Sequence, residues 1–198
     1  PFLRYRRLLH IYHAAREQGL SDAAFVDLGE ELDEAIAQGE GQGFRVTPFG
    51  PTAELGRAVG LGSAGLWVKD ETGNVSGTHK ARHLMGVMLW LQSHERLGLL
   101  PPSSEERPLA ISSCGNAALA AAVVARAAER TLDVFIPPEA HPGVVERLRA
   151  KGARLPVCAR EGNEPGDPCY LGFRRAVAAG GLPFTCQGNE NGLVIEGG

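Results

Sequence analysis

A lysine closes a loop of small and polar residues in the first half of the chain. Residues 70–82 read DETGNVSGTHKAR and follow a short apolar stretch, so we expect Lys80 in the first turn of a helix. The positive end of the helix dipole disfavours the charged form of an amine placed there. Lys80 is therefore a candidate nucleophile for Schiff-base formation with a carbonyl compound. Spacing alone leaves open the alternative that it is a solvated lysine on an amphipathic helix.

A second loop combines a glycine and an asparagine with small polar residues. Residues 113–117 read SCGNA and stand between an expected strand and an expected helix. Backbone N–H groups at such a helix start bind carboxylates or phosphates, and Gly115 permits close approach of a ligand. A helix that is capped by Asn116 and binds nothing fits the same residues, so both interpretations remain open at this point.

Short apolar stretches alternate with helical patterns from residue 66 onward. We expect strands at 66–69, 109–112, 133–136, 154–157 and 183–186, and helices at 78–92, 117–128, 142–150 and 168–179. This alternation predicts an α/β fold with a mainly parallel sheet, right-handed crossovers and helices on its faces. Ligands bind beyond the carboxyl ends of such strands, which singles out the loops after Lys69 and Ser112.

Two helical patterns precede this α/β region. Residues 4–18 and 21–39 each carry an apolar stripe and are closed by a glycine, so we expect an N-terminal helical extension over residues 1–42. A glycine-rich loop and a short helix at 52–59 follow. Residues 43–198 then make up the α/β region.

The composition of the 198 residues, with 43% hydrophobic and 22% charged residues, is that of an ordinary globular protein. A formal net charge of -3 argues against a nucleic-acid or membrane partner and favours a small molecule or another protein as partner. No apolar run approaches the roughly 20 residues of a membrane span, and no leader is seen. The four cysteines form no close pair, which predicts a reducing, cytoplasmic location.

Four segments resemble motifs of one enzyme family. Residues 74–80, NVSGTHK, resemble the NPTGSFK signature of the fold type II pyridoxal-phosphate enzymes, which include threonine synthase, threonine/serine dehydratase, cysteine synthase and the tryptophan synthase β subunit. Residues 113–116 resemble the family's Gly-Asn loop, and residues 47–48 the beginning of its Thr-Pro-Leu segment. Residues 188–197 resemble the Asn-x-x-x-x-Glu-Gly stretch of threonine synthases.

The resemblance assigns roles to individual residues. It implies that Lys80 holds pyridoxal 5'-phosphate and that Asn116 contacts the 3'-oxygen of this cofactor. The loop residues that it expects at the substrate carboxylate are Ser113, Cys114, Gly115 and Ala117. Cys114 stands where the family has Ser or Thr, and Ala117 where it has His or Thr, so the substrate is not identified. No metal is implied.

The resemblance also implies an amino-acid substrate and a reaction that begins with removal of its Cα proton. Elimination or replacement at the β or γ carbon follows. Residues 188–197 favour a threonine synthase-like reaction, whereas residues 80–82, KAR, favour a dehydratase or another ammonia-lyase.

The family's fold implies that residues 66–160, roughly, form a small domain and that the rest belongs to a large domain, incomplete here. The glycine-rich phosphate cup of the family, and its Ser or Thr for the pyridine nitrogen, are not found in the sequence. We therefore expect a longer functional unit, which the resemblance implies to be a homodimer, and we expect this chain alone to be inactive.

Other interpretations rest on fewer residues. Cys114 at a helix start would suit a thiol hydrolase, but no histidine follows His141 to act as its base. A non-catalytic domain that keeps the fold is a further alternative. Residues 60–65 match G-x-G-x-x-G, but they precede a strand instead of joining a strand to a helix. His79 and His83 have zinc-ligand spacing without a third ligand, so we expect that they bind no metal.

Overall fold

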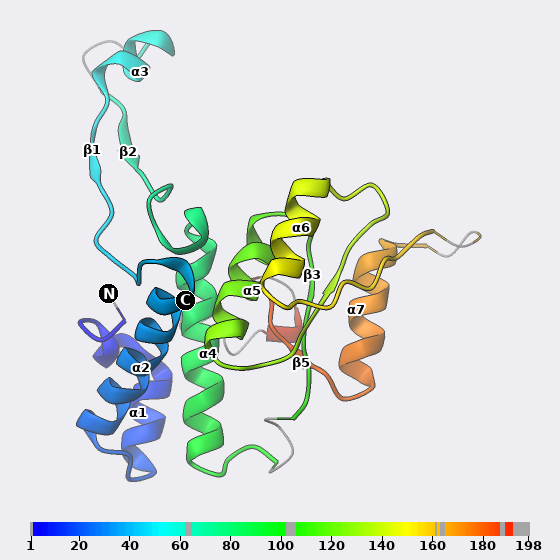
Figure 1. Cartoon of the computed structure of the whole chain (residues 1–198). Helices are drawn as coiled ribbons and strands as arrows, with labels where there is room; N and C mark the ends of the chain where they lie inside the picture. The colour runs from blue at the N-terminus through cyan, green and yellow to red at the C-terminus, as the bar shows by residue number, and fades with distance from the viewer. Residues whose placement is uncertain are drawn as a thin grey trace.

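The computed structural model describes residues 2–61, 65–101, 106–160, 162, 165–186 and 189–191. Most of the threonine synthase-like stretch at 188–197, and the middle of the glycine-rich match at 60–65, lie outside the described residues. The described part has helices toward the N-terminus and a parallel sheet, covered by helices, toward the C-terminus (Figure 1).

Three parallel strands form the central sheet. β3 (Leu109–Ser112) lies in the middle, with β4 (Leu132–Phe135) on one side and β5 (Leu182–Pro183) on the other. All residues of β3 except the last are buried, as a parallel strand covered on both faces requires. The predicted strand at 154–157 occurs only as two isolated parallel bridges beside β4, and the one predicted at 183–186 is shorter and begins one residue earlier.

Helices cover both faces of this sheet (Figure 1). α5 (Asn116–Ala127) packs against β3 and β4 on one face, and α4 (Lys80–Arg96) packs on α5. α6 (Pro142–Ala150) also contacts α5, whereas α7 (Pro168–Ala178) packs against β3 and β4. α7 has its own small core, separate from that of α5, so it covers the opposite face. The layered α/β fold with a parallel sheet is therefore confirmed.

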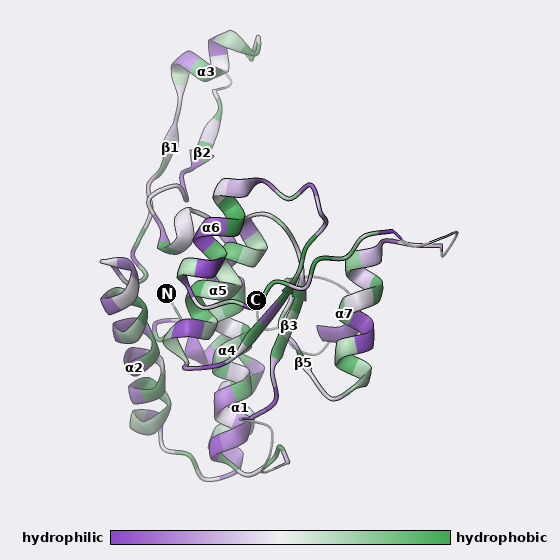
Figure 2. Cartoon of the chain, turned by 45° about the vertical axis from the view of Figure 1, so that its right-hand side comes forward, coloured by the Kyte–Doolittle hydropathy of each residue, from purple (hydrophilic) through white to green (hydrophobic). Residues whose placement is uncertain are grey.

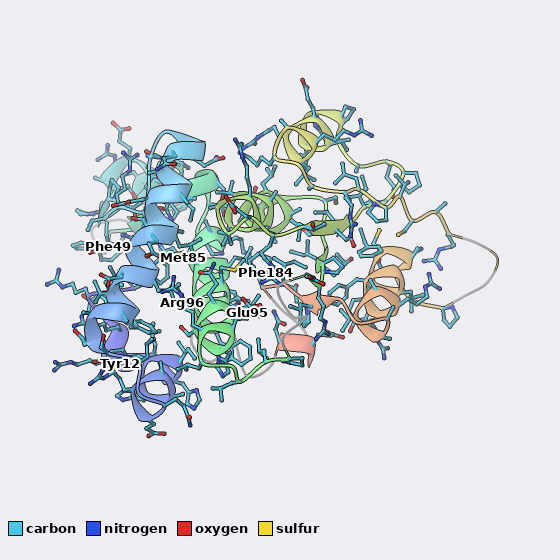
Figure 3. The ribbon with its side chains drawn as sticks, turned by 60° about the horizontal axis from the view of Figure 1, so that its bottom comes forward. Tyr12, Phe49, Met85, Glu95, Arg96 and Phe184 are labelled. Atoms are coloured by element: carbon cyan, nitrogen blue, oxygen red, sulfur yellow. The ribbon has the colours of Figure 1, made fainter. Side chains whose placement is uncertain are left out.

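The main hydrophobic core lies around α5. It includes Met85 of α4 and Phe184 beside β5, which are both fully buried (Figure 3). Figure 2 shows hydrophobic residues along β3 and the helix faces that surround it. A smaller core, which contains Phe135 and Phe173, lies between the sheet and α7. Within the described ranges, none of the helices combines the length and the apolar character needed to cross a bilayer.

The two N-terminal helices pack against α4. α1 (His10–Glu17) contacts α4, and its Tyr12 packs edge-on against Phe25 of α2 (Asp22–Glu40). α2 also contacts α4 and α5. Gly41, with a φ of 77°, ends α2 just past its predicted end at residue 39. The helical extension thus forms a layer over α4, while the proposed domain limits at residues 42 and 160 stay predictions.

A hairpin projects from the body of the molecule (Figure 1). β1 (Phe49–Pro51) pairs with β2 (Trp67–Lys69) in an antiparallel two-stranded sheet, and α3 (Ala53–Ala58) lies at its tip. Phe49 and Trp67 are exposed, with their ring centroids 5.3 Å apart. The hairpin therefore presents apolar side chains to solvent.

The prediction that residues 66–69 form a strand of the parallel sheet was wrong. Trp67 and Lys69 are exposed, whereas a strand inside a parallel sheet is buried on both faces. The partner strand β1 was not predicted, because Phe-Gly-Pro lacks an alternating pattern and proline is confined to edge strands. The loops after Lys69 and Ser112 consequently do not share one sheet edge, and helix packing brings them together instead.

Candidate active site

The loop before α4 bends sharply. Asp70 accepts hydrogen bonds from the backbone N–H of Thr72 at 2.9 Å and from its hydroxyl at 2.6 Å. One turn of 3-10 helix, η3 (Val75–Gly77), follows. Ser76 and Gly77 both have left-handed backbone angles, with φ of 57° and 73°. This conformation is costly for a serine, and such strain often marks functional loops.

Lys80 lies in the first turn of α4, as predicted, but the helix begins at Lys80 itself, two residues later than expected. His79 is the N-cap residue, and its side chain makes no capping hydrogen bond. The hydroxyl of Thr78 accepts from the backbone N–H of Lys80 only over 3.4 Å. Contacts other than a cap must therefore position the start of this helix.

Glu71 connects the loop to its neighbours. Its carboxylate accepts hydrogen bonds from Thr47 Oγ1 at 2.5 Å, Asn74 Nδ2 at 2.7 Å and Arg82 Nε at 2.9 Å. Burial alone would raise the pKa of Glu71. The three hydrogen bonds and the charge of Arg82 outweigh burial and hold this pKa below its ordinary value, so the carboxylate is charged at neutral pH.

The ammonium group of Lys80 lies close enough to His83 and Cys186 to affect their protonation. Burial first, and then the positive charge of Lys80, lower the pKa of His83. Burial raises the pKa of Cys186, while the charge of Lys80 opposes this rise. His83 lies one turn along α4 and Cys186 follows β5, so the segment after β5 lies within electrostatic range of the start of α4.

The chain has three lysines, and two of them have partners. Lys69 donates to the backbone carbonyl of Thr47 at 2.6 Å, and Lys151 forms an ion pair with Glu40. The ammonium of Lys80 has no hydrogen bond or ion pair within the described part of the chain. Of the three lysine amines, that of Lys80 is thus the one left available there.

The second predicted loop lies where β3 ends. Ser113 is partly buried, whereas Cys114 and Asn116 are exposed. Gly115 is the N-cap residue of α5, so the interpretation in which Asn116 caps the helix is wrong. No side chain caps this helix, and a Cβ built on Gly115 would meet no atom within 4 Å. Within the described residues, the first turn of α5 thus keeps N–H groups that no side chain caps, as an anion site needs, although the Gly115 N–H donates to Ser113 Oγ over 3.4 Å.

Packing brings the two loops to neighbouring positions. η3 and α4 both contact α5, the helix that begins at Asn116. The other predicted substrate residues are divided: Ala117 lies in the first turn of α5, while Ser113 and Cys114 line a cavity of about 470 Å³. Lys80 and Asn116 do not line that cavity.

Three buried polar atoms close to Lys80 along the chain have no hydrogen-bond partner among the described residues. They are Asn74 Oδ1, Ser76 Oγ and His83 Nε2. Buried polar atoms without partners are rare in native proteins and call for a ligand or water. Of the three, His83 lies on the same helix face as Lys80, so its ring nitrogen is the group that a polar ligand at Lys80 would meet.

The cavity beside Cys114 bears on the thiol-hydrolase alternative. Cys158 and Cys169 also line it, but no histidine is found among its lining residues. Burial, and then the nearby Cys158, raise the pKa of Cys169 to about 12, so this thiol stays protonated. The described residues that line this cavity thus supply no histidine base to Cys114.

Three residues of the site were not expected from the sequence: Glu71, His83 and Cys186. His83 was considered only with His79 as a zinc ligand, but His79 is exposed whereas His83 is partly buried. Its position three residues after Lys80, and thus on the same helix face, was a signal that could have identified it. Cys186 had no such signal, because its place depends on the pairing of β5 with β3.

A family model described as "Pyridoxal-phosphate dependent enzyme" matches residues 41–197, well over half of the chain. Comparison with curated proteins found no match.

Several solved structures share the fold. A pyridoxal 5'-phosphate-dependent aspartate racemase has a TM-score of 0.59 and 21% identity, over 87% of this chain and 47% of that chain. Diaminopropionate ammonia lyase from Escherichia coli, in its apo form, has a TM-score of 0.59 and 17% identity, over 88% and 49%. Maize serine racemase has a TM-score of 0.55 and 18% identity, over 86% and 48%. The chain thus spans about half the length of these proteins.

Proposed function

The chain belongs to the family of pyridoxal-phosphate dependent enzymes, and on that basis we propose that its Lys80 holds pyridoxal 5'-phosphate in an enzyme that acts on an amino acid. The observation that carries this proposal is the state of the three lysines. Lys69 and Lys151 are engaged by other groups, whereas the ammonium of Lys80 has no hydrogen bond or ion pair within the described residues.

The residues around Lys80 fit this cofactor. An unengaged amine can condense with an aldehyde carbon with loss of water, and the unpartnered ring nitrogen of His83, on the same helix face, offers a polar contact. The uncapped start of α5 offers backbone N–H groups to an anion, which suits a carboxylate or a phosphate. These groups belong to elements that pack together, since η3 and α4 both contact α5.

The residues of the chain would position the cofactor and the substrate and would transfer the proton. When bound, pyridoxal phosphate supplies an electron sink for the negative charge left at the substrate Cα. In our proposal Lys80 Nζ takes the Cα proton, and the N–H groups beside Gly115 bind the substrate carboxylate. Asn116 would help to hold the cofactor, as the resemblance of residues 113–116 to the family's Gly-Asn loop implies. His83, whose pKa is lowered by burial and by Lys80, stays neutral near pH 7 and adds no second charge beside the amine.

Two reaction types remain candidates for the complete protein. Residues 188–197 favour a threonine synthase-like replacement, whereas Lys80-Ala81-Arg82 favours a dehydratase or another ammonia-lyase. Elimination releases ammonia and a 2-oxo acid, whereas replacement retains the amino group. Analysis of the products for both compounds therefore separates the two candidates.

Proton exchange tests the step that both reactions share. The complete protein that contains this chain is loaded with pyridoxal phosphate and incubated in deuterated water with a panel of small amino acids, and loss of the α-proton signal is followed by NMR. We expect exchange with at least one amino acid and none after Lys80→Ala. The matched control Lys151→Ala, which removes a lysine engaged by Glu40, should leave exchange unchanged. Equal exchange in Lys80→Ala would contradict the role of Lys80.

A further inference from the structure

We propose that Glu71 is a positioning residue: its carboxylate holds Arg82 and thereby fixes the rotation of the first turn of α4, which sets the direction of Lys80. The inference deepens the proposed function, because it concerns the residue that would hold the cofactor. It assigns Glu71 no contact with cofactor or substrate.

Helix geometry places the side chains of Lys80 and Arg82 on opposite sides of α4. An α-helix turns by about 100° per residue, so side chains two residues apart point about 200° away from each other. Arg82 is held by Glu71 Oε2 at 2.9 Å and by the backbone carbonyl of Arg45 at 2.8 Å. With Arg82 fixed, Lys80 must leave α4 on the opposite side.

The surroundings of Lys80 agree with this geometry. A residue three positions further along a helix lies within about 60° of the first, so His83 shares the face of Lys80. The pKa of His83 and that of Cys186 both respond to the charge of Lys80, while Glu71 responds to Arg82. The two charged side chains of the first turn therefore act on different groups, on opposite sides of the helix.

Buried groups anchor this clamp, by which we mean Thr47, Glu71, Asn74 and Arg82. Thr47 and Asn74 are 3% and 2% exposed, and both donate to the Glu71 carboxylate. The side chains of Glu71 and Arg82 are 14% and 23% exposed, so water screens their ion pair less than it screens a surface pair. Thr47, singled out in the sequence as part of a family-like segment, thus has a role in holding the lysine loop.

The clamp replaces a helix cap. His79 makes no capping hydrogen bond, and Thr78 contacts the N–H of Lys80 only over 3.4 Å. Without a cap, the first turn of a helix frays unless side chains tie it down. The ion pair between Arg82, on the helix, and Glu71, in the preceding loop, holds this first turn in place.

The first experiment observes Lys80 without the cofactor. Reductive methylation with ¹³C-formaldehyde labels the three lysines and the terminal amine, and Lys80→Arg assigns the Lys80 signal in the NMR spectrum. We expect Glu71→Gln and Arg82→Gln to shift and broaden the Lys80 signal alike, and the double variant to equal either single one. The Lys151 signal should stay in place, which reports that the chain remains folded.

Glu95→Gln is the matched control. Glu95 belongs to the same helix, at its other end (Figure 3). It pairs with Arg130 in a buried ion pair whose side chains are 7% and 6% exposed. The Glu95→Gln substitution therefore removes a buried carboxylate from α4 and leaves the clamp residues unchanged. If Glu95→Gln moved the Lys80 signal as much as Glu71→Gln, the effect would be general destabilisation and the proposal would be wrong.

The second experiment follows the reaction of Lys80 with pyridoxal phosphate. The protein is mixed with limiting cofactor, reduced with borohydride and digested, and label on Lys80 is compared with label on Lys151. We expect Glu71→Gln to lower the ratio on the order of tenfold, because misplacing a reacting group by about 1 Å costs up to about a hundredfold. An unchanged labelling ratio together with an unchanged Lys80 signal would overturn the proposed role of the clamp.

The two experiments separate two failures. If Lys80 takes no cofactor even in the unchanged chain, the proposed function fails, while the NMR signal still decides the role of Glu71. If Lys80 is labelled selectively but its NMR signal is the same in Glu71→Gln, the proposed function stands and the positioning role of Glu71 is wrong.

Discussion

The guanidinium of Arg82 donates a hydrogen bond from Nε to Glu71 Oε2 over 2.9 Å, and this contact joins α4 to the loop that precedes it. Eleven residues separate the two along the chain. A second nitrogen of Arg82 reaches the carbonyl of Arg45 at 2.8 Å. One side chain thus links three segments around the start of the helix that carries Lys80.

Arg82→Ala should destabilise the fold more than removal of an exposed arginine from the same helix. It leaves the Glu71 carboxylate, 14% exposed, without its charged donor, so we expect a loss of about 1–3 kcal/mol in the free energy of unfolding. The control Arg96→Ala breaks a pair with Glu31 whose side chains are 43% and 62% exposed, and should cost less than about 1 kcal/mol. Urea denaturation measures both, and equal losses would contradict the account.

Stability should depend on Glu71 at acidic pH. The folded pKa of Glu71 lies below its ordinary value, so the folded state binds fewer protons than the unfolded state. The stabilisation is therefore present above the unfolded pKa, near about 4.3, and is lost as pH falls through the folded value. Urea denaturation between pH 6 and pH 3 should show a shallower pH dependence in Glu71→Gln, and an identical slope would exclude this role.

His83 should report the charge of Lys80. Burial, followed by the charge of Lys80, lowers the pKa of His83, so its NMR titration should have a midpoint below about 6.5. Lys80→Met removes the charge but keeps an apolar side chain of similar length, and the midpoint should rise. An unchanged midpoint in Lys80→Met would show that the two groups do not interact.

Two glycine-to-alanine changes should have opposite effects. A Cβ on Gly172 in α7 would lie 2.8 Å from Phe135 Cδ1 and 3.1 Å from Cys158 Sγ, so Gly172→Ala should cost about 1–3 kcal/mol through overpacking. A Cβ on Gly39 in α2 would meet only Arg126, at 4.0 Å, and Gly39→Ala should stabilise by about 0.5–1 kcal/mol. Thermal unfolding of both variants tests the packing of α7 on the sheet, which a stabilising Gly172→Ala would contradict.

The parts of the fold that were predictable are those with a local pattern. β3 begins with three apolar residues, Leu109 to Ile111, directly after a proline, and α6 begins with a proline and keeps its apolar stripe to Ala150. β1 has no such pattern, so the pairing that removes β2 from the parallel sheet was not predictable. A hairpin is specified by both of its strands, and one of them was not recognised.

In the candidate site too, the residues with a local sequence pattern were predictable and the others were not. Lys80 and the loop of Gly115 were identified because each follows an apolar stretch and precedes a helical pattern. The partners of Glu71 were not, because Thr47 and Arg82 lie 24 and 11 residues away and meet only in the folded chain. Likewise, the proximity of Cys186 to Lys80 depends on β5 lying beside β3.

The most direct test of the central claim is the site of covalent attachment of pyridoxal phosphate. The protein is incubated with the cofactor, reduced with borohydride and mapped by mass spectrometry of its peptides, which must distinguish only three lysines and the terminal amine. We predict label on Lys80 well above that on Lys69 and Lys151, with near-visible absorbance that disappears in Lys80→Ala. Equal labelling of the three lysines, or unchanged absorbance in Lys80→Ala, would contradict the claim.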